Sequence, residues 1–244
     1  MLNRKMILRF TGLACTLAIA VFLVSTAISA QEGGAKPTQA EMDAAKAAWP
    51  KDVNRDTGYR LAYPKRDDMD DAGKKVYDQL IVGANVGMVG PFGVQMWSPQ
   101  YQAIVRQLNQ FLRSDTAGMT PHVQEVSILV ACRESNADFE WTAHEGLAQK
   151  AGVDQKVIDA IKFKKSLDGL PAEDVAIIQL GREMYSKHKV GSDTFARANK
   201  IYGPGKLVNI VGLMGFYSTA AGELEAFGFE MPAGQKSLLP ASGR

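Results

Sequence analysis

The feature that most constrains the fold is a helix that begins at Thr120-Pro121 and is apolar on much of its circumference. Threonine before proline is a helix-start signal, because the threonine oxygen can accept a backbone N–H and proline suits the first helical position. The apolar residues that follow are Val123, Val126, Ile128, Leu129, Val130 and Ala131. A helix that is apolar on so many sides has to be covered by other elements. The sequence therefore predicts a central core helix.

The same signals predict further helices before and after it. Ser98-Pro99 offers a cap and a first-turn proline, and Asn136 or Asp138 is expected to cap the helix that contains Trp141. β-branched runs are short and lie inside helical periods, so strand signals are weak and the class is all-α. The other expected elements are helices over residues 40–48, 68–81, 154–163, 171–188 and 206–227, a helix capped by residues 192–194, a loop over residues 83–93 and a turn at residues 203–205.

The first thirty residues have the pattern of a secretory signal. Three basic residues precede an apolar run that starts near Thr11 and ends near Ala27, and the small residues Ser29-Ala30 follow. An uncleaved membrane anchor is the alternative, because the run approaches the roughly 18 to 20 residues that a spanning helix needs. The small-residue ending and the polar segment from Gln31 favour cleavage. We therefore expect a periplasmic or secreted protein with no stable membrane insertion after cleavage.

Cleavage after residue 30 leaves about 214 residues, which is enough for one domain with a real core. We assign residues 31–60 to a flexible leader, residues 61–232 to the helical domain and residues 233–244 to a flexible tail. The Gly-, Lys- and Gln-containing start of the leader is typical of a mobile terminus. The irregular arm that follows is expected to lie on a partner or on the domain itself.

Charge and cysteine content exclude several classes of function. The chain has 28 Lys or Arg and 26 Asp or Glu. Without residues 1–30, which contain three of the basic residues and none of the acidic ones, 25 remain against 26 and the formal charge is −1. No basic field for nucleic acid remains. Cys132 is the only cysteine outside the predicted signal, so it is either buried, the commoner fate of a free cysteine, or reactive.

Two carboxylates, one thiol and one imidazole lie within twenty residues of each other in the sequence. Glu125 and Cys132 fall on one stripe of the central helix, and Glu140 and His144 are four residues apart on the next helix. If the two helices fold against each other, the four side chains can converge on one cavity. An apolar wall that includes Trp141 and Trp97, with Phe139, would raise the pKa of a carboxyl group. The alternative is that Glu140 and His144 form only a weak surface pair.

The same residues resemble a known family. The string Glu125-x-x-Ile128-Leu129, followed by Glu140-Trp141-x-x-His144, is similar to the carboxymuconolactone decarboxylase family, which includes the alkylhydroperoxidase D proteins. The resemblance covers roughly residues 60–232 and includes Leu147-Ala148, Ala151-Gly152-Val153, Gly90-Pro91-Phe92, Ser98-Pro99, residues 207–211, Gly215-Phe216-Tyr217 and Ala226-Phe227. It implies an alkylhydroperoxidase D-like helical bundle that assembles as a homo-oligomer, a trimer or a hexamer.

The resemblance also implies roles for individual residues. Glu125 and His144 match the proton relay of the peroxidase branch, but its two redox cysteines would fall at Ala137 and Glu140, so a dithiol mechanism is not expected. Glu140 and His144 match the decarboxylase branch, which needs no metal or organic cofactor, although that branch need not have a carboxylate at Glu125. We expect no metal site, since one histidine with carboxylates is a poor zinc signature.

The leading hypothesis is a cofactor-independent lyase or isomerase that acts on a small carboxylated or lactone-like compound. His144 would move the proton, Glu140 or Glu125 would orient and charge it, and Trp141, Tyr217 and Trp97 would line the substrate pocket. Two alternatives remain open. One is a single-cysteine thiol enzyme, similar to a peroxidase, that uses Cys132, and the other is a non-catalytic small-molecule-binding protein on the same scaffold.

Overall fold

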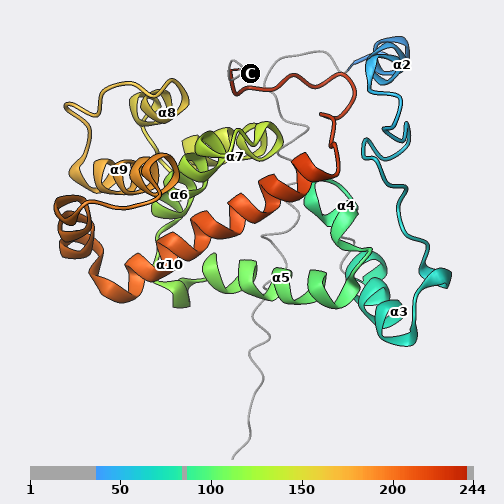
Figure 1. Ribbon diagram of the computed structural model, residues 1–244, viewed down its shortest axis with the longest axis horizontal. Helices are drawn as coiled ribbons and strands as arrows, with labels where there is room; N and C mark the ends of the chain where they lie inside the picture. The colour runs from blue at the N-terminus through green and yellow to red at the C-terminus, as the bar shows by residue number, and fades with distance from the viewer. Residues whose placement is uncertain (1–36, 84–86, 241–244) are drawn as a thin grey trace, which may run out of the picture.

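The computed structural model describes residues 37–83 and 87–240, and all the regular structure in these two ranges is helical, as predicted (Figure 1). The predicted signal peptide lies outside the described residues. The helices are α2 (Gln39–Ala48), α3 (Asp71–Tyr77), α4 (Pro91–Gln95), α5 (Pro99–Leu112), α6 (Pro121–Glu134), α7 (Asp138–Lys150), α8 (Gln155–Lys162), α9 (Ala172–Lys187) and α10 (Ser192–Ala226), with short turns η1 (Arg66–Asp68), η2 (Asp78–Gly83) and η3 (Asp115–Ala117).

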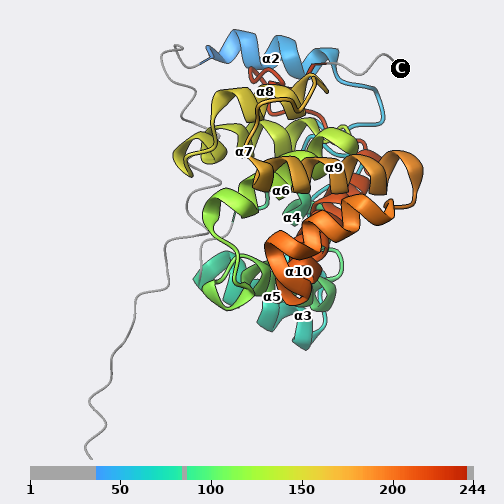
Figure 2. The same ribbon diagram turned by 90° about the vertical axis from the view of Figure 1, so that its left-hand side faces the viewer.

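The predicted core helix is α6, and its central position is confirmed. It packs against α7, α8, α9 and α10, and Figures 1 and 2 show it between these elements. Ten consecutive residues of α6, from Val123 to Cys132, are buried. The Thr120 hydroxyl caps the helix by accepting the backbone N–H of Val123. A helix with apolar residues on several sides is stable here because other helices cover it.

The long helix α10 crosses α6 and brings the C-terminal half of the chain onto the core. It bends at Gly203, where φ is 73°, so the turn expected at residues 203–205 is a kink within one long element. Proline after this glycine cannot donate the hydrogen bond that would continue the first half. By length and composition alone α10 could cross a membrane, and 44% of its most apolar window is buried inside the protein.

Several expected local features differ in the structure. Ser98 forms no side-chain cap, and α7 begins after Ala137 without one. Asn136 does not cap α7 because it adopts a left-handed conformation in the turn from α6, with φ of 51°, and its amide oxygen accepts a hydrogen bond from Arg133. The loop expected over residues 83–93 gives way to α4 at Pro91, because proline suits the first turn of a helix.

The assignments of a flexible leader and a flexible tail are wrong for the described residues. From residue 37 onward the leader is ordered: a capping box between Thr38 and Glu41 starts α2, and Tyr59 is buried against Phe229. The tail is ordered to residue 240, where Leu239 is buried in the main core. Apolar side chains just outside the predicted domain bounds thus add to its packing.

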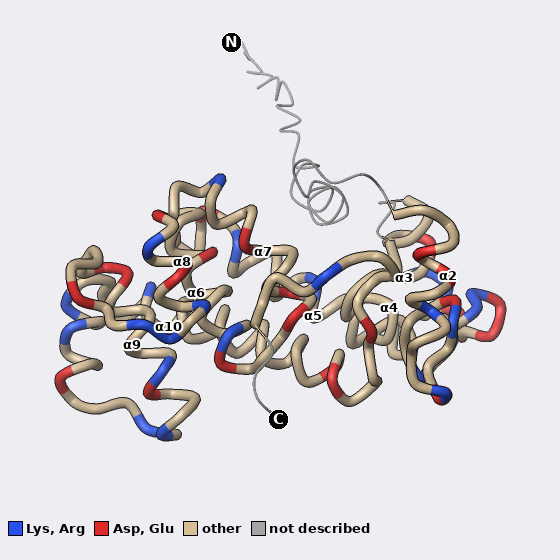
Figure 3. The backbone as a smooth tube through the Cα atoms, turned by 90° about the horizontal axis from the view of Figure 1, so that it is seen from above, with Lys and Arg blue, Asp and Glu red and all other residues tan. Residues whose placement is uncertain are grey.

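Basic and acidic residues are interspersed over the described chain (Figure 3). Short charged pairs such as Arg66–Asp78 and Lys164–Glu134 join neighbouring segments. The Arg66 pair is exposed enough for water and salt to screen it, so we assign it little stability.

Gly181 on α9 permits the close approach of α9 to α6. A Cβ atom at this position would lie 2.2 Å from Cγ1 of Val130. We expect Gly181→Ala to lower the free energy of unfolding by about 1–3 kcal/mol, the usual cost of overpacking a core. Gly146→Ala is the matched control, since a Cβ there meets no atom within 4 Å and alanine favours the helix. Urea unfolding of both variants tests this, and equal stability of Gly181→Ala and the wild type would contradict the packing argument.

Candidate functional site

The predicted acid and imidazole residues of α6 and α7 meet in the core, as expected from their spacing. Nδ1 of His144 lies 2.7 Å from Oε2 of Glu125. His144 is 2% exposed and Glu125 is 3% exposed. The pair forms because α6 and α7 are joined by the tight turn at residues 135–137 and pack side by side, so that residues nineteen positions apart face each other.

Two further residues, from other helices, complete the arrangement. The Arg113 guanidinium, just after α5, donates to Oε1 of Glu125 over 2.8 Å and to the Tyr217 hydroxyl over 3.1 Å. The Tyr217 hydroxyl, on α10, lies 3.1 Å from Nε2 of His144. We call Arg113, Glu125, His144 and Tyr217 the four-residue network. Tyr217 was expected only to shape a pocket, and Arg113 was missed, since no sequence signal sets it apart from the other basic residues.

The network defines which nitrogen of His144 holds the proton. Burial by itself raises the pKa of Glu125, but His144 and Arg113 outweigh burial and hold that pKa below its ordinary value. Glu125 is therefore ionised near neutral pH and can only accept, so Nδ1 of His144 is the donor to it. Burial also raises the pKa of Tyr217, so its hydroxyl keeps its proton and can donate to Nε2. In this tautomer Nε2 accepts the hydrogen bond from the Tyr217 hydroxyl.

Glu140 is the second carboxyl group beside the imidazole, and its environment is the opposite of that of Glu125. Its Oε2 lies 3.9 Å from Nε2 of His144, and its side chain is 8% exposed. Burial raises the pKa of Glu140; the charges of His144 and Arg113 oppose this rise without cancelling it, and the nearby Glu223 adds to it. The Glu140 carboxyl forms no hydrogen bond within the described part of the chain, yet neither oxygen is sealed from solvent. It is therefore a carboxyl group with a raised pKa that is free to bond to another molecule.

Cys132 lies behind this site, and the interpretation that it is a buried core thiol is confirmed. It is fully buried and free. Burial and then the charges of Glu140 and Glu125 raise the pKa of the Cys132 thiol well above its ordinary value. A reactive cysteine needs the opposite, an accessible thiol with a lowered pKa.

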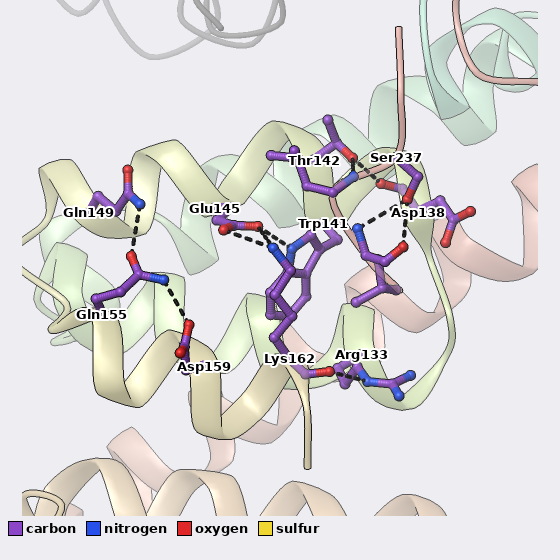
Figure 4. Close-up of polar contacts among 12 residues, drawn as sticks. Arg133, Asp138, Trp141, Thr142, Glu145, Gln149, Gln155, Asp159, Lys162 and Ser237 are labelled. Carbon is purple, nitrogen blue, oxygen red and sulfur yellow. Dashed lines mark hydrogen bonds and ion pairs between the residues drawn. The ribbon is translucent and has the colours of Figure 1, made fainter. Parts of the chain in front are cut away.

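The two tryptophans expected to line the pocket lie elsewhere. Trp97 is 55% exposed and its indole N–H donates to the carbonyl of Ala62. Trp141 is buried, but its indole N–H donates over 2.6 Å to Glu145, which is also paired with Lys162 of α8 (Figure 4). Although Trp141 is only three positions before His144, it bonds to Glu145, on the side of α7 that faces α8. Its role is to join α7 to α8.

Neither of the two best-formed hollows in the described part of the chain is lined by Glu125, Glu140 or His144. One of about 690 Å³ adjoins the α6–α7 turn and the end of α10, where Ala137 and Glu225 line it. The other, of about 390 Å³, is an apolar hollow between α9 and α10. The chamber expected beside His144 is not among them. Instead the Tyr217 ring stands edge-on to the imidazole, with centroids 5.0 Å apart.

The remaining histidines are separate from the network. His122 Nε2 lies 2.7 Å from Oδ1 of the buried Asp174 on α9. His188 ends α9 in a left-handed conformation and is exposed. Within residues 37–83 and 87–240, no group of three or more His, Cys, Asp and Glu side chains is placed to hold a metal ion.

Comparison of the chain with protein-family models, with curated proteins and with solved structures finds no match.

Proposed function

We propose that the protein is an exported, cofactor-independent lyase or isomerase of the carboxymuconolactone decarboxylase type, acting on a small carboxylated or lactone-like compound by Glu/His proton transfer. The observation that supports this most is the pair of carboxyl groups on either side of one imidazole. The pKa of Glu125 is lowered and that of Glu140 is raised. Two carboxyl groups whose surroundings move their pKa values apart are suited to different roles in acid–base chemistry.

In the proposed reaction the substrate loses carbon dioxide as the bond between its ring carbon and its carboxylate breaks. The electron pair stays on the ring carbon and is shared with the lactone carbonyl as a dienolate. The neutral carboxyl of Glu140 then donates its proton to carbon, and the resulting carboxylate is reprotonated from solvent. His144, oriented by Glu125 through Nδ1, holds or returns the proton at Nε2. Placing these groups in a dry site strengthens their effect on the developing charge.

This assignment narrows the roles expected from the sequence. Glu125 orients His144, Glu140 donates the proton, and Tyr217 supports Nε2. The resemblance in residues 125–144 agrees with the 2.7 Å contact between Glu125 and His144. We also propose a homo-oligomer, a trimer or a hexamer. Large apolar side chains stay exposed on α5 and α10, namely Ile104, Leu108, Phe111 and Val208, and exposed apolar surface of this kind often marks an interface.

Turnover of carboxymuconolactone by the purified protein, followed by ultraviolet absorbance, tests the proposal. We expect the absorbance of the substrate to change in proportion to enzyme concentration without added metal or organic cofactor. A panel of related γ-lactone acids should be run beside it, because an exported enzyme is expected to act on a relative of that compound. Failure of every member of the panel to react would reject the lyase assignment.

Two further measurements separate the alternatives. Binding of a panel member without turnover, measured by calorimetry, would favour the non-catalytic binding protein, and the closed packing around His144 is the observation on that side. Rapid labelling of native Cys132 by iodoacetamide near pH 7 would favour the thiol enzyme, which the buried thiol with its raised pKa argues against.

A further inference from the structure

The end of α5 presents unused hydrogen-bonding groups to the inside of the protein. Asn109 and Arg113 are one helical turn apart, with the Arg113 backbone N–H donating to the Asn109 carbonyl, and Gln102 is seven residues before Asn109. Offsets of seven and four place all three on one face of the helix. We call these three residues the inner polar face of α5. Ile104, Leu108 and Phe111 occupy the opposite face and are exposed. The hydrophobic effect favours the opposite arrangement, with the apolar face buried and the polar face exposed. The burial of the inner polar face therefore needs another explanation.

The amides of this face lack partners. The described structure contains three buried side-chain atoms without a hydrogen bond, and two of them are Oε1 of Gln102 and Oδ1 of Asn109. The amide nitrogen of Asn109 also has no side-chain partner among the described residues. Exchanging the oxygen and nitrogen of this amide would therefore still leave a buried atom without a hydrogen bond. A buried amide left unpaired is costly and calls for a bound group. A hydroxyl suits either orientation, because it can both donate and accept.

Arg113 has donors to spare at the same place. A guanidinium has five N–H donors, and the described contacts of Arg113 use its two terminal nitrogens, on Tyr217 and Glu125. Its Nε–H bonds to no described residue and is not sealed inside the protein. The Arg113 side chain is 27% exposed, whereas the other three members of the four-residue network are buried. Arg113 is thus the one charged group through which the network reaches solvent.

We propose that Arg113 and Asn109 form a subsite for a hydroxycarboxylate, in which the free edge of Arg113 binds the carboxylate and Asn109 binds the adjacent hydroxyl. This rests on the proposed function and names the class of its substrate: a carboxylic acid with a hydroxyl group close to the carboxylate. An anion bound to Arg113 lies next to the four-residue network, because the same guanidinium contacts Glu125 and Tyr217, and both of these contact His144. Arg113 therefore has two roles: it positions the substrate, and it positions Glu125.

Lactate and propanoate are the probes, since they differ only in the hydroxyl group next to the carboxylate. Each is titrated at equal ionic strength into the purified protein, and the backbone amide signals of residues 109–118 are followed by NMR. We expect lactate to bind about fivefold more tightly than propanoate, the effect of about one net hydrogen bond. Asn109→Leu should remove this preference and leave propanoate binding unchanged. Arg113→Lys should weaken both ligands, and Arg106→Lys on the same helix is the matched control that should weaken neither.

Several outcomes would overturn the subsite. These are equal affinities for the two ligands, a lactate preference that survives Asn109→Leu, binding that is the same in Arg113→Lys and Arg106→Lys, or no binding, which would mean that water alone satisfies the amides. The assay needs no turnover, so its result is distinct from that of the lactone assay. If lactate binds but no lactone of the panel reacts, only the proposed lyase is rejected. If a lactone reacts but lactate does not bind more tightly than propanoate, only the subsite is rejected.

Discussion

Replacing His144 by glutamine is expected to lower kcat for the lactone substrate by about 10²–10⁴-fold, the usual contribution of a positioned general acid or base. The imidazole contacts Glu125, over 2.7 Å, through Nδ1 and Tyr217, over 3.1 Å, through Nε2. Glutamine keeps a donor for Glu125, so the fold and the charge of Glu125 should survive. It has no nitrogen that can accept and return a proton near neutral pH. Steady-state kinetics with the substrate identified by the panel measure the effect.

His188→Asn is the matched control for this variant. It also replaces a histidine by an amide, at an exposed helix end where asparagine tolerates the left-handed conformation. We expect its kcat to equal that of the wild type. A kcat for His144→Gln within twofold of the wild type, with an unchanged circular dichroism spectrum, would remove His144 from the mechanism and favour a proton route that starts from Glu140 alone.

Glutamine at Glu125 and at Glu140 should change stability in opposite directions. Glu125→Gln is expected to lower the free energy of unfolding at pH 7 by about 3 kcal/mol, because it breaks a buried charge pair and leaves Arg113 without its partner. Glu140→Gln is expected to raise the free energy of unfolding at pH 7, because it removes a carboxyl group whose ionisation is opposed by burial, a cost to the folded state above the unfolded pKa.

The pH dependence of these two variants follows from the direction of each pKa shift. The folded pKa of Glu125 is lowered, so its stabilising effect is present above its unfolded pKa and is lost as the pH falls through the folded pKa. The folded pKa of Glu140 is raised, so its stabilising effect is complete below its unfolded pKa and is lost as the pH rises through the folded pKa. The destabilisation by Glu125→Gln should therefore shrink in acid, and the gain from Glu140→Gln should grow above its unfolded pKa.

Urea unfolding of the wild type and both variants from pH 3 to pH 8 measures these differences. The two variants are matched, since each replaces one buried glutamate of the same site by the same amide. Parallel stability profiles for Glu125→Gln and Glu140→Gln would show that the two carboxyl groups share one environment, and the division of their roles would then fall.

Much of the fold followed from local signals. The Thr120 cap, the first-turn proline and the apolar residues of α6 were enough to predict a central helix in an all-α protein, because each acts over one or two turns. The signals were less reliable where neighbouring segments compete. Ser98 and Asn136 had the right chemistry for a cap but not the right backbone conformation. The leader and the tail were assigned as flexible because the partners of Tyr59 and Leu239 are far away in the sequence.

The candidate site, like the fold, was predicted in part from local spacing, and the rest of it depends on tertiary contacts. Helical spacing placed Glu125 and Cys132 on one helix face and Glu140 and His144 on another, and the packing of α6 on α7 brought the two faces together. Spacing could not supply Arg113, because the end of α5 meets α6 only through the tertiary fold. Nor could it exclude Trp97 and Trp141, whose side chains point away from His144.

By itself the sequence determined the helical class, the core helix and which acid, thiol and imidazole groups are available, because these depend on composition and on contacts within a few residues along the chain. Only the tertiary structure decided which carboxyl group is ionised, which nitrogen of His144 holds its proton and which arginine reaches solvent. Those properties depend on burial and on charges that belong to four different parts of the chain, and a local pattern contains no information about either.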